Sequence, residues 1–311
     1  ISKSYAMNRL MQGDVGSGKT IIAILASAIS VSNKVQVAIM APTEILANQH
    51  YKSFKKYTDS AQISCALLVG GMPAKERNKI LSGLKNHKID IVIGTHALIQ
   101  KDIEFNSLGL VVVDEQHRFG VNQRNLLIQK GINPHLLSMT ATPIPRTLAI
   151  TYHGDMDLSV IDEIPKNRIP VVTKMVDEKR LNKVYSFIID EVKAGKQCMI
   201  VHPLIEESEK SDLLAAIDMY DTLSTTVFKE LNVGLLHGRQ DKLQKEKIMH
   251  DFSKNKINIL LSTTVIEVGI DVPNATVMLI ENAERFGLTQ LHQLRGRVGR
   301  GSKKSYCILV Q

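Results

Sequence analysis

Near the start of the chain lies a glycine-rich stretch, GDVGSGKT at residues 13–20, whose residue types and spacing suit phosphate binding. Gly13 is followed by four residues and then by Gly18, Lys19 and Thr20, which matches the pattern GxxxxGK[ST]. Glycines let successive backbone N–H groups turn inward around a phosphate chain, and the lysine ammonium stabilises its charge. A flexible glycine turn without a ligand is the alternative. The candidate nucleotide-binding residues are Gly13, Asp14, Val15, Gly16, Ser17, Gly18, Lys19 and Thr20.

A second set of candidates is a carboxylate pair at the end of an apolar run, LVVVDEQH at residues 110–117. Open parallel sheets place their ligands at the carboxyl ends of strands. Asp114 can hold Mg²⁺ together with the Thr20 hydroxyl, and Glu115 can orient or deprotonate an attacking water. A solvated acidic pair that opens a helix is the alternative. With the glycine loop upstream, the pair predicts a site that binds Mg²⁺ and hydrolyses a nucleotide.

The third set lies near the end of the chain, in QLHQLRGRVGRG at residues 290–301. Gln293, Arg297 and Arg300 share one face of a helix if the helix persists, although the glycines among them indicate that it breaks. Guanidinium groups pair with phosphate oxygens, so these arginines could stabilise the transferred γ-phosphoryl group from a second domain. A basic surface patch is the alternative. The predicted catalytic set is Lys19, Asp114, Glu115, Gln293, Arg297 and Arg300.

The elements that must position these residues alternate between strand-length apolar runs and amphipathic helical stretches, the rhythm of parallel α/β sheets. The runs are VQVAIMAP, ISCALLVG, DIVIGT, LGLVVVDE and HLLSMTAT, then QCMIVHP, VGLLHG, INILLST, TVMLIEN and SYCILV. The two groups are separated by DEIPKNRIPVV, residues 162–172, which reads as a linker. No fixed-period repeat is present. We therefore expect two domains, 1–165 and 166–311, each an open, mostly parallel sheet flanked by helices.

Composition is that of a globular protein and permits a polyanionic partner. The chain has 311 residues, 44% of them hydrophobic and 23% charged, and no apolar run reaches the length of a membrane span. Its three cysteines are isolated, which argues against disulfides and a zinc site, and we expect no structural metal. The formal charge of +8 is shared, with 17 basic against 13 acidic residues up to position 165 and 22 against 18 after it. A partner such as nucleic acid could contact both domains.

These motifs, in this order, resemble those of superfamily 2 helicases. GDVGSGKT, APTEILANQHY, GTHALIQ, DEQH, TATPIPRT, STTVIEVGIDVP and QLHQLRGRVGR cover nearly the whole chain, and DEQH is typical of the DExH branch. The resemblance implies two tandem RecA-like P-loop domains, the first with the P-loop and DEQH and the second with the arginine-finger motif. More narrowly, DEQHRFGVNQR and TATPIPRTLAI resemble bacterial ATP-dependent DNA helicases that branch-migrate Holliday junctions and reverse stalled forks in recombination and repair.

The resemblance also implies roles for residues whose chemistry is less evident. Residues expected to face the nucleic acid, mainly its phosphate backbone, are Thr43, Thr95, His96, Arg239, Thr263 and Thr264. Residues expected to couple the ATP site to DNA are His117, Thr140 and Thr142, and those expected to close on nucleotide from the second domain are Gly269 and Asp271. Taken alone, Thr43 is as well explained as a helix cap and His117 as a structural histidine.

Parts that the resemblance implies for such helicases are missing from these residues: the upstream glutamine motif that recognises adenine, the N-terminal wedge domain and the C-terminal translocation hairpin. We therefore expect an excised motor, monomeric, without membrane association and acting on duplex or branched DNA in the bacterial cytoplasm. Three alternatives stay open: a double-stranded DNA translocase of the transcription-repair coupling type, an RNA-directed DExH helicase, and a nucleic-acid binding module without catalysis.

Overall fold

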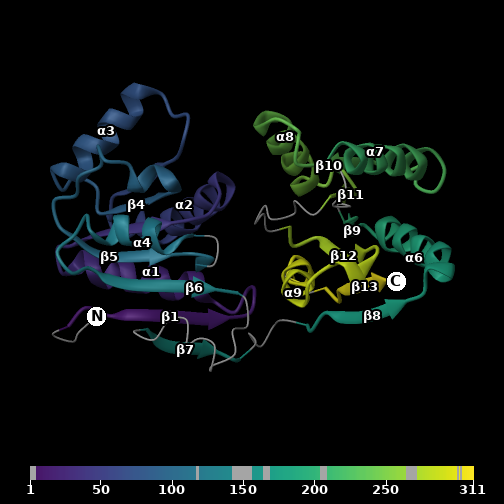
Figure 1. The fold of residues 1–311 in the computed structure, drawn as a ribbon, viewed down its shortest axis with the longest axis horizontal. Helices are drawn as coiled ribbons and strands as arrows, with labels where there is room; N and C mark the ends of the chain where they lie inside the picture. Colours follow the sequence, from purple (N-terminus) through teal and green to yellow (C-terminus); the bar gives the residue numbers. More distant parts are fainter. Residues whose placement is uncertain are drawn as a thin grey trace. The chain divides into compact units, whose positions relative to one another are not determined.

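The chain divides into two compact units, Ile1–Glu163 and Ile164–Gln311, and each contains its own sheet (Figure 1). The computed structural model describes residues 5–116, 119–141, 156–163, 169–203, 209–263, 272–299, 301 and 303–311. No helix in this described part of the chain is both long and apolar enough to span a membrane.

The first unit is built on a seven-stranded parallel sheet with the strand order β3-β4-β2-β5-β6-β1-β7. Its strands are β1 Asn8–Gly13, β2 Gln36–Met40, β3 Cys65–Leu68, β4 Ile91–Gly94, β5 Leu108–Val113, β6 His135–Thr140 and β7 Asp157–Ile161. Its helices are α1 Lys19–Ser32, α2 Glu44–Thr58, α3 Ala74–Lys85 and α4 Val121–Ile128, with the 3₁₀ turn η1 at His96–Ile99. Four of the seven strands, β2 to β5, are almost wholly apolar because helices cover both faces.

Side chains alternate between the two faces of this sheet, as the period of a strand requires. Val37 and Ile39 of β2 pack with buried residues of α1 and α2, such as Ile24 and Phe54. The neighbouring positions on β2 pack instead with α3, α4 and η1 on the opposite face. The carboxyl ends of the strands are therefore the edge at which the loops are free to hold functional residues.

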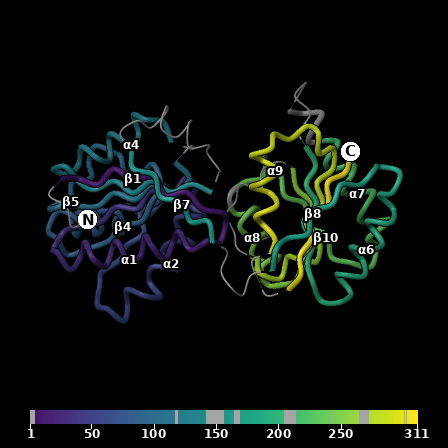
Figure 2. The backbone as a smooth tube through the Cα atoms, turned by 90° about the horizontal axis from the view of Figure 1, so that it is seen from below, coloured from purple at the N-terminus to yellow at the C-terminus, as the bar shows by residue number. Residues whose placement is uncertain are grey.

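The second unit has a six-stranded parallel sheet with the order β10-β11-β9-β12-β13-β8, and helices lie on both of its faces (Figure 2). Its strands are β8 Val172–Val176, β9 Gln197–Val201, β10 Val233–Leu236, β11 Ile259–Ser262, β12 Ala275–Ile280 and β13 Tyr306–Val310. Its helices are α6 Leu181–Lys193, α7 Glu209–Thr225, α8 Lys242–Ser253 and α9 Leu288–Arg295, with 3₁₀ turns η3 Glu178–Arg180 and η4 Ala283–Arg285.

The two sheets are built alike, strand for strand, although the sequence shows no fixed-period repeat. A glutamine opens the corresponding strands β2 and β9 and fastens each to the loop before the neighbouring strand. Gln36 Nε2 donates to the carbonyls of Leu84 and Ile89, and Gln197 Nε2 donates to those of Phe252 and Ile257. The only difference in strand order is β7, which pairs with β1 in the first unit and has no counterpart beside β8 among the described residues.

All ten apolar runs form strands, which confirms the predicted parallel α/β architecture. The sequence did not predict β7 or β8, which flank the segment interpreted as a linker. Both are edge strands that contain only exposed and half-buried residues, so they carry no continuous apolar signal.

Candidate nucleotide and nucleic-acid site

The glycine-rich loop joins the end of β1 to the start of α1. Gly16 and Gly18 adopt the left-handed backbone conformation, with φ of 76° and 102°. A Cβ at Gly13 would come within 2.5 Å of the Ser17 hydroxyl oxygen. Glycine is therefore favoured at Gly13 by the limited space and at the other two positions by backbone conformation. The loop also turns on itself, since the Ser17 N–H donates to the Asp14 carbonyl at 3.1 Å.

The amino end of α1 carries no side-chain cap. Gly18 occupies the cap position, and the first turn contains no acidic residue. By contrast, Thr43 caps α2 and Asp241 caps α8 with their own side-chain oxygens. The first-turn N–H groups and the positive end of the α1 dipole are therefore suited to an anion, such as the phosphates of a nucleotide.

Lys19 lies across the loop that precedes it. Its ammonium group donates to the carbonyls of Gly13 at 2.6 Å and of Asp14 at 2.9 Å. The positive charge is thus held between the loop and α1, where a phosphate chain would meet it. Thr20 is the second residue of the same helix and is only partly buried.

Asp114 follows β5 directly and is buried, with only 8% of its surface exposed. Its Oδ2 lies 2.7 Å from His50 Nε2 on α2, and its Oδ1 accepts a hydrogen bond from the Glu115 N–H at 3.0 Å. Burial acts to raise the pKa of the Asp114 carboxyl, but the hydrogen bond to His50 and the charges of His50 and Lys19 outweigh it, so this pKa lies below its ordinary value. Asp114 is therefore a buried carboxylate that stays ionised and lies within the electrostatic influence of Lys19. Such a carboxylate is a suitable oxygen ligand for a divalent cation at this loop.

Glu115 connects the end of β5 to the end of β6. Its backbone is in the left-handed conformation, with φ of 49°, which a residue with a Cβ seldom adopts. Its Oε2 accepts from the Ala141 N–H at 3.5 Å, directly after Thr140, the last residue of β6. Thr140 itself is buried. A movement of the Glu115 carboxylate would therefore alter its contact with the loop after β6, which the sequence predicts to couple ATP to DNA.

Three nucleic-acid candidates lie at strand ends in the first unit. Thr43 follows β2, and its hydroxyl caps α2 by accepting from the Leu46 N–H at 3.3 Å. Thr43 is therefore a helix cap, as one of the two interpretations of the sequence predicted. Thr95 follows β4 and is buried, whereas His96 beside it is exposed. The His96 ring lies 5.5 Å from the ring of Phe119, which belongs to the segment after DEQH. This ring contact joins the loop after β4 to the segment after β5.

The second unit places further candidates at the corresponding edge of its own sheet. Thr263 follows β11, and its N–H donates to the Leu236 carbonyl at the end of β10 at 3.2 Å. Arg239 is exposed in the turn that follows β10. Burial and the charges of Lys245 and Arg239 lower the pKa of His237 in the same turn. Thr95 and Thr263 follow corresponding strands, β4 and β11.

Gln293 lies on α9, whereas Arg297 lies beyond the end of that helix. Gly296 terminates α9, and the Arg297 N–H donates to the Leu294 carbonyl at 2.9 Å in the following turn. Gln293 and Arg297 therefore do not share one helix face, because α9 ends before Arg297, as the glycines indicated. Six candidates fall outside the described residues: His117, Thr142, Thr264, Gly269, Asp271 and Arg300.

Two features of these strand ends were not found from the sequence. His50 lies in the middle of α2, and its pairing with Asp114 joins residues 64 positions apart. In the second unit, Glu281 follows β12 as Asp114 follows β5, and it is likewise buried. It accepts from the Tyr185 hydroxyl at 3.0 Å and lies 3.3 Å from His202 Nδ1. The sequence signal for this resemblance is the shared RFG in DEQHRFG, 114–120, and ENAERFG, 281–287.

Comparison with known proteins identifies the class. Residues 3–151 match the DEAD/DEAH box helicase family, and residues 179–302 match the helicase conserved C-terminal domain. The chain therefore belongs to the helicases that join these two domains, and its two parallel-sheet units are tandem RecA-like helicase domains.

Within this class the chain is similar to RecG, as the sequence motifs predicted. It is 54% identical over 304 residues to the ATP-dependent DNA helicase RecG of Thermotoga maritima and 52% identical over 310 residues to that of Bacillus subtilis. These matches include 98% and 100% of this chain but 39% and 46% of the relatives. A solved structure of RecG bound to a three-way DNA junction matches with a TM-score of 0.83 and 50% identity, over 99% of this chain and 40% of the other. The chain thus spans less than half the length of these relatives.

Proposed function

We propose that the chain is the motor of an ATP-dependent DNA helicase, which couples ATP hydrolysis to movement on duplex or branched DNA. The observation that carries this proposal is the convergence of the glycine-rich loop, Lys19 and the ionised Asp114 at the carboxyl edge of one sheet. The similarity to RecG, which has been seen on a three-way DNA junction, supports DNA rather than RNA as the substrate. The proposed roles include Holliday junction branch migration and the reversal of stalled forks, in the bacterial cytoplasm.

The proposed nucleotide site is held by residues 13–20, in the domain that we assign to 1–165. The α1 N-terminus and Lys19 would bind the phosphates, and Thr20 and Asp114 would hold Mg²⁺. Bound Mg²⁺ and ATP supply a phosphoanhydride whose charge the cation helps to neutralise. Glu115 is the proposed base, because its carboxylate follows the buried end of β5 and is fixed by the Ala141 N–H.

The second domain, assigned to 166–311, would contribute Gln293, Arg297 and Arg300 to hydrolysis and Gly269 and Asp271 to nucleotide closure. Guanidinium groups stabilise the charge that develops on a transferred phosphoryl group, so their withdrawal would stop turnover without abolishing binding. DNA would contact Thr43, Thr95 and His96 in the first domain and Arg239, Thr263 and Thr264 in the second, chiefly through phosphates. His117, Thr140 and Thr142 would couple the two events. We propose a monomer, with a wedge domain in the full-length protein.

Phosphate release tests this proposal. ATP turnover should be measured without nucleic acid and with a Holliday junction, linear duplex DNA, single-stranded DNA and structured RNA, using Lys19→Ala as the inactive control. We expect stimulation by the junction or the duplex and little by RNA. Equal turnover with every nucleic acid and with none would contradict a DNA-directed motor, and turnover that survives Lys19→Ala would contradict the proposed site.

A further inference from the structure

The second sheet ends in an open edge at the position where the first sheet carries an additional strand. β1 and β8 occupy corresponding places in the two strand orders, and β1 is covered by β7 through parallel pairing. β8 is the last strand of its sheet in the described part of the chain. An open strand edge presents backbone groups that another chain can pair with.

The backbone hydrogen bonds of β8 show which of its groups face this edge. The Val172 N–H donates to the Ser305 carbonyl at 2.9 Å, and the Gln311 N–H donates to the Val176 carbonyl at 3.3 Å. Because backbone groups alternate along a strand, those of Thr173 and Met175 point away from β13. Both residues are exposed, and the Met175 side chain is 64% exposed.

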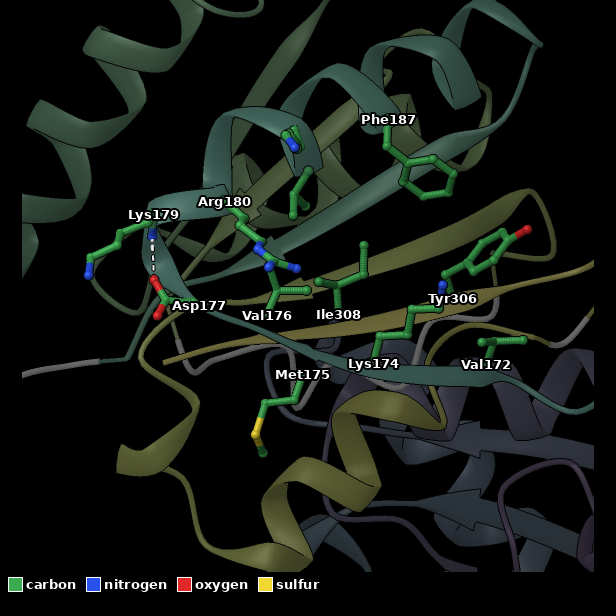
Figure 3. A pocket seen from close by; sticks show the side chains of 12 residues that line it. Val172, Lys174, Met175, Val176, Asp177, Lys179, Arg180, Phe187, Tyr306 and Ile308 are labelled. Atoms are coloured by element: carbon green, nitrogen blue, oxygen red, sulfur yellow. Dashed lines mark hydrogen bonds between the residues drawn. The ribbon is translucent and has the colours of Figure 1, made fainter.

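Beside this edge lies a groove of about 650 Å³ between α6 and strands β8 and β13 (Figure 3). Its floor is apolar and consists of Val172, Val176, Val184, Phe187, Tyr306 and Ile308. The rings of Phe187 and Tyr306 meet edge to face, with centroids 5.1 Å apart. Apolar floors of this kind accept the alternate side chains of an extended peptide.

The rim of the groove is strongly basic. Four of its lining residues are cations, namely Lys174, Lys179, Arg180 and Lys183, against one acid, Asp177. Asp177 is engaged locally, since its Oδ1 accepts from the Lys179 N–H at 2.8 Å and caps the turn η3. None of the four cations forms an ion pair within the described ranges, so their charge is available to an acidic partner.

We propose that the β8 edge and its groove bind an extended acidic segment of a partner protein, which adds a strand beside β8 as β7 does beside β1. The pairing of β7 with β1 shows the same chemistry within this chain, because Asp157 of β7 forms an ion pair with Arg9 of β1 at 2.9 Å. Apolar side chains of the segment would lie on the groove floor and its carboxylates would meet the rim. A nucleic-acid backbone would use the cations but not the apolar floor.

The probe is a peptide with the sequence of β7 and its flanks, MDLSVIDE, residues 156–163. It is titrated into the 311-residue chain, and methyl NMR follows Val172, Val176 and Ile308. We expect the shifts of these methyl groups to saturate with the peptide. A control peptide with lysine in place of each acidic residue should leave them unchanged.

Two variants test the two parts of the site. Lys174→Glu combined with Lys183→Glu should weaken the peptide at least about fivefold, because two favourable charge contacts become repulsive. Thr173→Pro should abolish binding, whereas Thr173→Ala should not, because proline removes an outward N–H that no strand of the sheet uses. Where Thr173→Pro perturbs folding, hydrogen-exchange protection of the Thr173 and Met175 amides on peptide addition replaces it.

Three results would overturn the proposal. The first is equal binding of the acidic and lysine-substituted peptides, and the second is unchanged affinity in the charge-reversed variant. The third is a single-stranded oligonucleotide that shifts the same methyl groups and displaces the peptide, which would make the groove a nucleic-acid contact. Because the readout is local to β8, these results are independent of ATP turnover.

Discussion

Replacing His50 with Gln tests whether the buried pair with Asp114 sets up the nucleotide site. His50 Nε2 and Asp114 Oδ2 are 2.7 Å apart, and their side chains are 9% and 12% exposed. The variant keeps a polar group of similar reach but removes the imidazole that lowers the pKa of Asp114. Both the stability of the first unit and the orientation of the Asp114 carboxylate should suffer.

The expected loss follows from the burial of both groups. A hydrogen bond to a charged group contributes about 1.5 to 3 kcal/mol, and leaving a buried carboxylate without its partner costs about 3 to 5 kcal/mol. Glutamine can retain part of this hydrogen bonding. We therefore expect the free energy of unfolding to fall by about 3 kcal/mol at pH 7, which lowers Tm by roughly 6 to 12 °C for a domain of this size.

The pH dependence has a defined sign. The pKa of Asp114 is lowered in the folded protein, so its contribution is fully present above the unfolded pKa of about 4 and is lost as pH falls through the folded value. The difference between the native chain and His50→Gln should therefore be largest near neutral pH and shrink below about pH 4.

Denaturant unfolding and ATP turnover measure the two effects together. The matched control is His87→Gln, since His87 Nε2 lies 4.0 Å from Asp90 Oδ1 in a more exposed pair, for which we expect less than about 1 kcal/mol and normal turnover. The reasoning is refuted if His50→Gln unfolds within about 0.5 kcal/mol of the native chain and hydrolyses ATP at the native rate.

Gln36→Leu removes a side chain that forms hydrogen bonds with four backbone groups. Urea unfolding should show that the free energy of unfolding falls by at least about 3 kcal/mol, and a fall below about 1 kcal/mol would contradict this prediction. Lys19→Ala should abolish ATP binding in calorimetry, and retained binding would count against the site. Tm should fall by less than about 4 °C, because the substitution removes only two partly buried hydrogen bonds. Burial and the charge of Asp59 raise the pKa of the Cys65 thiol to about 12, so iodoacetamide at about pH 8 should alkylate it at least tenfold more slowly in the native chain than in urea, and equal rates would contradict this.

Continuous apolar runs made most of the fold predictable from the sequence. Strands such as β5 and β12 are buried on both faces, so nearly every residue is apolar and the signal is strong. β7 and β8 escaped prediction because each lies at a sheet edge, where half of the side chains face water. The prolines between them marked a break in the chain but gave no sign of the strands on either side.

The glycine loop and the DE pair were predictable because their chemistry is local. The spacing of Gly13, Gly18 and Lys19 fixes backbone shape and charge within one turn, so no tertiary information is needed. His50 was not predictable, because its role arises from the packing of α2 beside the end of β5. The correspondence of Asp114 with Glu281 was not predictable either, because it follows from the matching order of six strands in the two sheets, and only three shared residues mark it in the sequence.

The proposed motor requires that charged groups of both domains act on one terminal phosphate. Arg300→Ala tests it most directly, with Arg295→Ala as the matched control, because the Arg295 guanidinium lies 3.1 Å from His292 Nδ1 on α9. Nucleotide affinity is measured by calorimetry and turnover by phosphate release in the presence of a Holliday junction. We expect Arg300→Ala to lower kcat by at least about a hundredfold and to change the Kd for ATP by less than about threefold, while the control stays near native. Equal losses of affinity and turnover, or turnover that survives, would contradict the account.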